Sequence, residues 1–107
     1  MTPFGFMKLS IVDGKIKSEW IYNNNGVIFT GPGEVTGNIN ESFEGKGEIV
    51  SYRPDGNKIY QMDFEILKAE DHYIMNWLSK GNIIYTGVGN LYDGALYSAF
   101  TTVTNKN

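Results

Sequence analysis

The sequence predicts an all-β protein in which eight antiparallel strands close into an up-and-down barrel. Eight segments alternate apolar and polar residues, Asp-Gly and Asn-Gly pairs stand between several of them, and no window keeps a helical apolar spacing for three turns. The segments recur about every 12 residues, which is typical of barrels and of sandwiches. We favour the barrel because closure removes exposed sheet edges, and a two-sheet β-sandwich is the alternative.

The expected strands and the turns between them fix which residues face each other. The strands are expected at residues 4–12, 15–22, 27–35, 43–52, 58–67, 72–79, 83–92 and 95–103. A two-residue loop at residues 13–14 sets the first hairpin, so that Met7 faces Trp20 while Lys8 faces Glu19 on the other side. This register separates apolar residues from an opposite-charge pair, which supports it.

The composition is that of one soluble globular domain covering residues 1–107. Hydrophobic residues make up 41% and charged residues 20% of the chain, and this length suffices for a single core. Since the chain has no Cys, it can form no disulfide and no thiolate metal site. The net charge is −3 and the nine Lys and Arg residues are scattered, so we expect no binding to nucleic acid.

The sequence also bears on cellular location. No basic segment followed by an apolar run opens the chain, and no apolar run is long enough to span a membrane. We therefore expect a cytoplasmic protein with no membrane partner. If the chain is a mature form that has lost a signal peptide, a secreted protein is the alternative.

Three stretches share a pattern in which an aromatic residue is followed by glycines two and four positions later. They read FTGPGEV, FEGKGEI and YTGVGNL, and their glycines are Gly31, Gly33, Gly45, Gly47, Gly87 and Gly89. The hairpin registers place Trp20 across from the first glycine of the first copy and Phe64 across from the second glycine of the second copy. Glycines inside strands either permit the sharp coiling of a small barrel, which we favour, or clear a hollow for a ligand.

The first two copies of this pattern are also expected to lie side by side. A connection between the third and fourth strands around Ile39 would place Gly31 beside Gly47 and Gly33 beside Gly45. The six glycines would then form one patch on the barrel wall.

The segment from Tyr73 to Phe100 resembles the calycin-like group of small barrels, which includes lipocalin-type and avidin-type proteins. It reads YIMNWLSKGNIIYTGVGNLYDGALYSAF, with a Tyr-x-aliphatic-x-Trp strand followed by a Tyr-x-Gly-Val-Gly strand and a short last hairpin. The resemblance implies an up-and-down barrel with an interior binding site. The lipocalin Gly-x-Trp near the first strand and the avidin-type residues that hold biotin have no counterparts here, so biotin is not expected as the ligand.

The predicted interior has few groups that could perform chemistry. It contains Ser and Tyr hydroxyls but no carboxylate, Lys or His, and the only His, His72, is expected to point outward. We therefore favour a protein that is not an enzyme and that uses no cofactor or metal, and a small isomerase or lyase is a third alternative. Arg53 falls on the interior face at a strand end, where it either anchors a ligand carboxylate at the barrel mouth or is a solvated turn residue.

The leading functional hypothesis is a barrel that binds a small apolar or aromatic ligand in its interior. Aromatic walls with few polar groups suit such a ligand. The residues expected to bound this cavity are Trp20, Tyr22, Phe64, Tyr73, Trp77 and Tyr85, with Arg53 at the mouth.

The rival hypothesis is a protein-interaction module, such as a regulator or an immunity-type inhibitor, that uses the outer face of the last three strands. A three-residue loop at residues 80–82 is expected to set the register there, so that Leu78 lies beside Ile84. The apolar residues of this expected interface are Ile74, Leu78, Ile84, Val88 and Tyr97. A contiguous apolar exterior usually marks an interaction surface, so we expect a homodimer or a protein partner.

Overall fold

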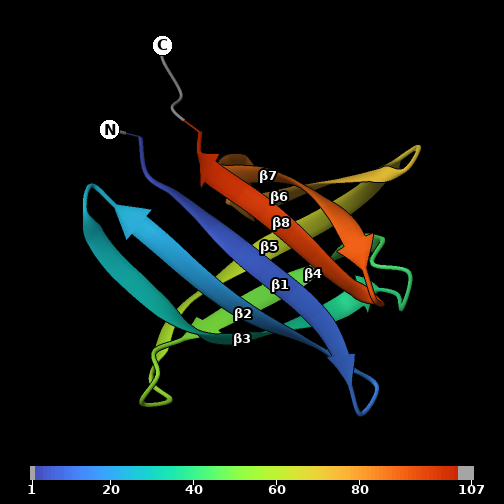
Figure 1. The fold of residues 1–107 in the computed structure, drawn as a ribbon, viewed down its shortest axis with the longest axis horizontal. Coiled ribbons are helices and arrows are strands. Elements are labelled where there is room, and N and C mark those ends of the chain that lie inside the picture. Colours follow the sequence, from blue (N-terminus) through green and yellow to red (C-terminus); the bar gives the residue numbers. More distant parts are fainter. Residues whose placement is uncertain (1, 104–107) are drawn as a thin grey trace.

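The protein forms a closed barrel of eight antiparallel strands in sequential order. The computed structural model describes residues 2–103, and in these residues each strand pairs with the next while the last pairs with the first (Figure 1). The strands are β1 (Phe4–Val12), β2 (Lys15–Asn24), β3 (Val27–Ile39), β4 (Gly45–Tyr52), β5 (Lys58–Ala69), β6 (His72–Ser79), β7 (Asn82–Tyr92) and β8 (Ala95–Thr102). Within this range there is no helix that is long and apolar enough to cross a membrane. The predicted fold class is confirmed, and the sandwich is not formed.

The turn residues set the registers of the hairpins as predicted. Asp13 and Asn25 adopt left-handed backbone conformations, with φ of 53° and 54°, each followed by a glycine with positive φ. Such turns suit two-residue hairpins, whose twist matches that of the strands. Met7 accordingly pairs with Trp20, as expected from the first turn.

The connection between β3 and β4 covers residues 40–44 and so lies further along the chain than the turn expected around Ile39, which corrects the position of the glycines. The Asn40 side-chain oxygen accepts hydrogen bonds from the backbone N–H groups of Ser42 and Glu44, at 2.9 and 3.1 Å, and so forms a compact loop after Ile39. Such local side-chain bonds compete with strand pairing. The fourth strand therefore begins at residue 45 and not at residue 43.

This shift changes the neighbours of the first two glycine copies. Gly47 pairs with Gly37, and Gly45 pairs with Ile39. Gly33 pairs instead with Ser51, in the last pair of that ladder. The expected neighbour pairs of residues 31 with 47 and 33 with 45 are therefore wrong.

The β6–β7 connection also differs from the prediction. The turn has two residues, Lys80 and Gly81, and a bulge follows, so that Leu78 pairs with Ile83 and not with Ile84. The bulge inserts one residue into β7 and restores the predicted pairing further along the strands. Trp77 thus still faces Tyr85.

The core fills the interior from the middle of the barrel to one end. Phe43, in the β3–β4 loop, has a positive φ of 58° and is only 2% exposed, so it closes that end of the barrel from the loop. The buried apolar residues of the cluster are Met7, Leu9, Ile16, Val35, Phe43, Ile49, Phe64, Ile66, Tyr73, Met75, Trp77 and Leu96. The other end carries the β2–β3 and β4–β5 turns, on the left in Figure 1, and we call it the mouth.

Candidate functional site

The mouth of the barrel contains a hollow of about 200 Å³, which we call the mouth pocket. It is lined by inward-facing side chains from the mouth ends of β2, β3, β5, β7 and β8. These residues are Trp20, Tyr22, Phe29, Ile59, Tyr60, Tyr85 and Phe100. Six of the seven are aromatic, so the walls offer flat apolar surfaces with hydroxyl groups at their edges.

The aromatic rings of the mouth pocket hold one another in a fixed arrangement. Tyr22 stacks on Phe100 with a centroid distance of 5.9 Å and an interplanar angle of 5°, and Tyr85 meets both rings edge-on at 5.9 and 6.0 Å. Below them the Trp77 ring packs against Phe100 and Phe64, with centroid distances of 5.1 and 4.9 Å. Such edge and stacked contacts rigidify the pocket, and Trp77 supports its walls from the core beneath.

The structure divides the predicted cavity residues into two groups. Trp20, Tyr22 and Tyr85 line the mouth pocket. Phe64 and Trp77 belong to the solid core beneath it and are 1% and 2% exposed. The hollow is therefore smaller than the predicted cavity and is confined to the mouth.

Two other predicted positions lie outside the mouth pocket. Tyr73 is 3% exposed within the core. Arg53 is exposed in the β4–β5 turn and lines a second hollow, of about 540 Å³, together with Phe29 and Ile59. Because these last two residues line both hollows, the second hollow adjoins the mouth pocket.

Four residues of the mouth pocket were missing from the predicted cavity. Phe29, Tyr60 and Phe100 face inward in the predicted registers, and the signal that could have found them is their position at strand ends that meet at the mouth. Ile59 has no such signal, because the bulge at Ser51 and Tyr52 shifts the register beside it.

The six glycines of the repeated pattern are covered by neighbouring backbone. A Cβ atom placed on any of them would lie 2.6 Å or less from a carbonyl oxygen of an adjacent strand. Carbonyl oxygens of Tyr52, Thr36 and Ala99, for example, cover Gly31, Gly47 and Gly87. The glycines therefore permit close approach of curved strands, and they do not line the mouth pocket.

The mouth pocket is uncharged at neutral pH. Burial, followed by the neighbouring Tyr85, raises the pKa of Tyr22 from 10.0 to about 12. Burial also raises the pKa of Tyr60. The phenol groups of Tyr22 and Tyr60 thus remain protonated and act as neutral hydrogen-bond donors and acceptors.

No group suited to acid–base chemistry near neutral pH lines the mouth pocket. His72 is exposed at the start of β6, as predicted, and its Nδ1 lies 3.3 Å from the Asn90 side chain. Within residues 2–103, no cluster of His, Asp and Glu is arranged to hold a metal ion. The arrangement favours binding of a neutral molecule.

The outer wall carries a continuous apolar row. Ile74 pairs with Val88, which pairs with Ala99, and the same row continues through Phe6 to Ile21. Val88 and Phe6 in this row are 63% and 60% exposed. The row therefore extends the predicted interface from β6–β8 onto β1 and β2.

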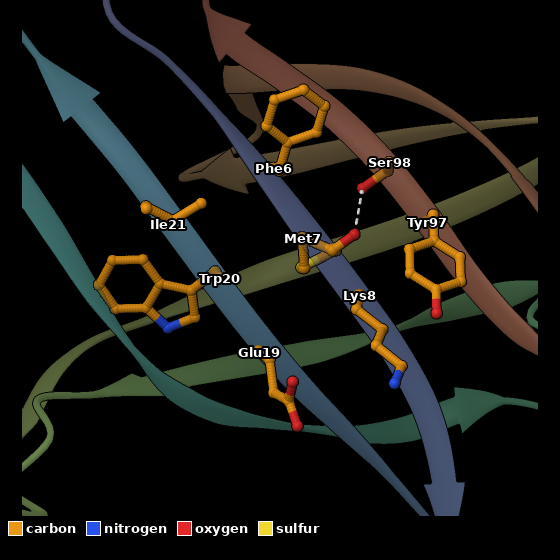
Figure 2. Close-up of a pocket in the computed structure, with 8 residues that line it drawn as sticks. All are labelled: Phe6, Met7, Lys8, Glu19, Trp20, Ile21, Tyr97 and Ser98. Atoms are coloured by element: carbon orange, nitrogen blue, oxygen red, sulfur yellow. Dashed lines mark hydrogen bonds between the residues drawn. The ribbon is translucent and has the colours of Figure 1, made fainter.

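The predicted interface residues are distributed unevenly over this wall. Tyr97, 44% exposed, lines a hollow of about 270 Å³ on the outer face of β8, β1 and β2, where Phe6 and Ile21 lie side by side near Lys8 and Glu19 (Figure 2). The other two predicted positions, 78 and 84, are only partly exposed near the β6–β7 bulge.

No protein-family model matches the chain, and no curated protein or solved structure is significantly similar to it.

Proposed function

We propose that this protein is a non-catalytic, calycin-like binding barrel that takes a small, neutral aromatic molecule into the mouth pocket. One observation carries the proposal: the core is solid from the middle to one end, while the other end keeps a hollow of about 200 Å³ walled by six aromatic rings. Pockets of this kind bind ligands by apolar contact and use a few polar groups for orientation. The Tyr22, Tyr60 and Tyr85 hydroxyls supply those groups.

The pocket's volume and shape define the ligand further. The hollow has the volume of a small molecule of two or three rings, and its parallel Tyr22 and Phe100 rings present a surface on which a flat molecule stacks. Burial of a charge against these walls would be costly, so neutral molecules are favoured.

The test is a titration of tryptophan fluorescence with the neutral probe N-phenyl-1-naphthylamine. Trp20 lines the pocket and Trp77 packs beneath it against Phe100, so binding should quench their emission and transfer energy to the probe. Replacing Phe29 with Ala should weaken binding about tenfold or more, since a buried phenyl ring contributes about 1.5–3 kcal/mol.

The matched control is Phe4→Ala. Phe4 and Phe29 are similarly exposed, at 43% and 46%, but Phe4 does not line the mouth pocket. Equal loss of binding in both variants, or no binding by the unmodified protein, would overturn the proposal.

A second candidate function is protein recognition by the outer wall, for which the continuous apolar row is the specific observation. Large exposed apolar surfaces on monomeric proteins mark sites of association. In this function a homodimer or another protein covers the row around Val88, and the mouth pocket is not needed.

A further inference from the structure

The first residues of β3 have an unpaired edge at the mouth. The β3–β4 ladder begins at Gly33 and runs to Ile39, and the Tyr52 carbonyl still covers Gly31, whereas residues 27–30 pair only with β2. The cause is a difference in length, because β3 has 13 residues and β4 has 8. Pro32, which has no N–H group, stands where the ladder stops.

The backbone groups on this edge can be assigned from the β2–β3 turn. In a two-residue hairpin, the flanking pair, here Asn24 and Val27, is hydrogen-bonded, and the direction of the backbone groups alternates from there. The N–H and C=O groups of Ile28 and Thr30 therefore face away from β2. Unpaired groups of this kind are a template for an additional strand.

A hollow of about 540 Å³, which we call the edge groove, lies along this unpaired segment. One wall is the β3 edge, and the other is the β4–β5 turn with Pro54 and Ile59. That turn satisfies its own backbone, because Arg53 N–H bonds to Asn57 O at 2.8 Å and Gly56 N–H bonds to Arg53 O at 2.9 Å. The turn thus leaves the β3 edge without a partner.

The edge groove carries one cationic side chain, Arg53, and one anionic side chain, Asp55. Arg53 forms no ion pair in the described part of the chain. The Asp55 carboxylate accepts hydrogen bonds from the backbone and side chain of Asn57, at 2.9 and 3.2 Å. Asp55 is thus held by Asn57, and Arg53 is the group of the groove that can pair with a carboxylate.

We propose that the edge groove binds an extended peptide by strand addition. The main chain of the peptide pairs with Ile28 and Thr30, and a carboxylate of the peptide meets Arg53. An aromatic side chain of the peptide enters the mouth pocket, which adjoins the groove at Phe29 and Ile59. This last contact rests on the proposed function and names its ligand class, whereas the backbone pairing does not depend on it.

The test uses the synthetic peptide acetyl-Glu-Val-Phe-Val-Glu-amide and isothermal titration calorimetry. A glutamate at each end offers a carboxylate in either strand direction. Two analogues each carry one N-methyl group, on the central phenylalanine or on the valine that follows it. Successive amides of a strand face opposite sides, so one methyl group blocks the pairing with β3 and the other faces away from it.

We expect one methylated isomer to bind at least tenfold more weakly than the parent peptide and the other to bind within about threefold of it. Equal affinities of the two isomers would overturn strand addition. Arg53→Gln should weaken binding of the parent peptide by about tenfold. The same substitution should not weaken binding of a peptide in which glutamine replaces both glutamates.

A second ligand separates this proposal from the proposed function. N-acetyl-phenylalanine amide carries the aromatic ring with too little main chain to pair along the edge. Binding of this amide with no gain in affinity for the longer peptide would overturn the inference and leave the mouth-pocket function standing. If one methylated isomer binds more weakly than the other and the protein does not bind N-phenyl-1-naphthylamine, the strand-addition inference stands and the mouth-pocket function is overturned.

Discussion

Gly5 decides how the rings of the mouth pocket are arranged. It lies in β1 between Phe100 on one side and Tyr22 on the other, and a Cβ atom at this position would lie 2.6 Å from the Phe100 ring. The bare backbone allows Phe100 to lie flat across β1 and stack on Tyr22. Gly5 lies outside the repeated glycine pattern, so only the structure reveals its role.

The raised pKa of Tyr22 gives a prediction for alkaline pH. Its folded-state pKa, about 12, exceeds the ordinary 10.0, so the folded protein holds this proton more tightly than the unfolded chain does. The stabilisation is complete below pH 10 and is lost as the pH rises to about 12. Absorbance at 295 nm should show a phenol that titrates near pH 12 and is absent in Tyr22→Phe, while circular dichroism follows the fold.

Tyr92 provides the internal comparison for this titration. It is 68% exposed and lies outside the mouth pocket, so Tyr92→Phe should leave the late transition intact. A single transition that contains every tyrosine of the folded protein would contradict the assignment.

At the scale of elements, the close pairing of β3 with β4 depends on two glycines that face each other, Gly37 and Gly47. A Cβ atom on Gly47 would meet the carbonyl of Thr36 and lie 3.3 Å from the Cα of Gly37. Gly47→Ala should therefore lower the free energy of unfolding by about 1–3 kcal/mol, because the overpacked strands must move apart. Urea unfolding followed by tryptophan fluorescence measures this change.

The control for this change is Gly14→Asn. Gly14 has a positive φ of 77°, and a Cβ atom placed on it would have no neighbouring atom within 4 Å. Asn tolerates that backbone conformation, so the effect should stay within about 0.5 kcal/mol. If both variants unfold at the same urea concentration, close packing between β3 and β4 does not stabilise the barrel.

Strand pairing was predictable wherever a short turn carries a recognisable signal. The Asp-Gly and Asn-Gly turns fixed the β1–β2, β2–β3 and β4–β5 registers, and the structure confirms them. The predicted β3–β4 register was wrong because the Asn40 side chain forms a loop through its hydrogen bonds. That loop contains no Asp-Gly or Asn-Gly pair that would have predicted it. The unpaired edge of β3 was missed for the same reason, since it depends on how far β4 extends.

At the scale of the whole molecule, the sequence could not say where the barrel is filled. Alternation showed that Trp20, Phe64 and Trp77 all face inward, but their depth depends on strand tilt and on how neighbouring rings pack. Phe43 closes one end from a loop, although its place in the alternating pattern predicts a strand. A hollow at only one end follows from these packing details and not from the pattern of residues.

The outer wall gives a prediction for the assembled state. If the apolar row forms a homodimer, Val88→Lys should halve the mass measured by light scattering, because a charge would be buried without a partner. Val88 is 63% exposed, so the change should leave the fold intact. Val12→Lys, at a site 48% exposed beside the β1–β2 turn, is the control. Equal masses for the protein and both variants would exclude the dimer.

The ladder between β1 and β8 leads us to expect that the barrel folds slowly. Seven of its eight ladders join strands that follow one another, but this one joins distant segments, and Thr101 Oγ1 donates to Pro3 O across 98 positions at 2.7 Å. Bringing such distant segments together costs chain entropy before the contacts form. The seven local hairpins can assemble into a curved open sheet first, and the protein gains its full cooperativity only when this last ladder closes.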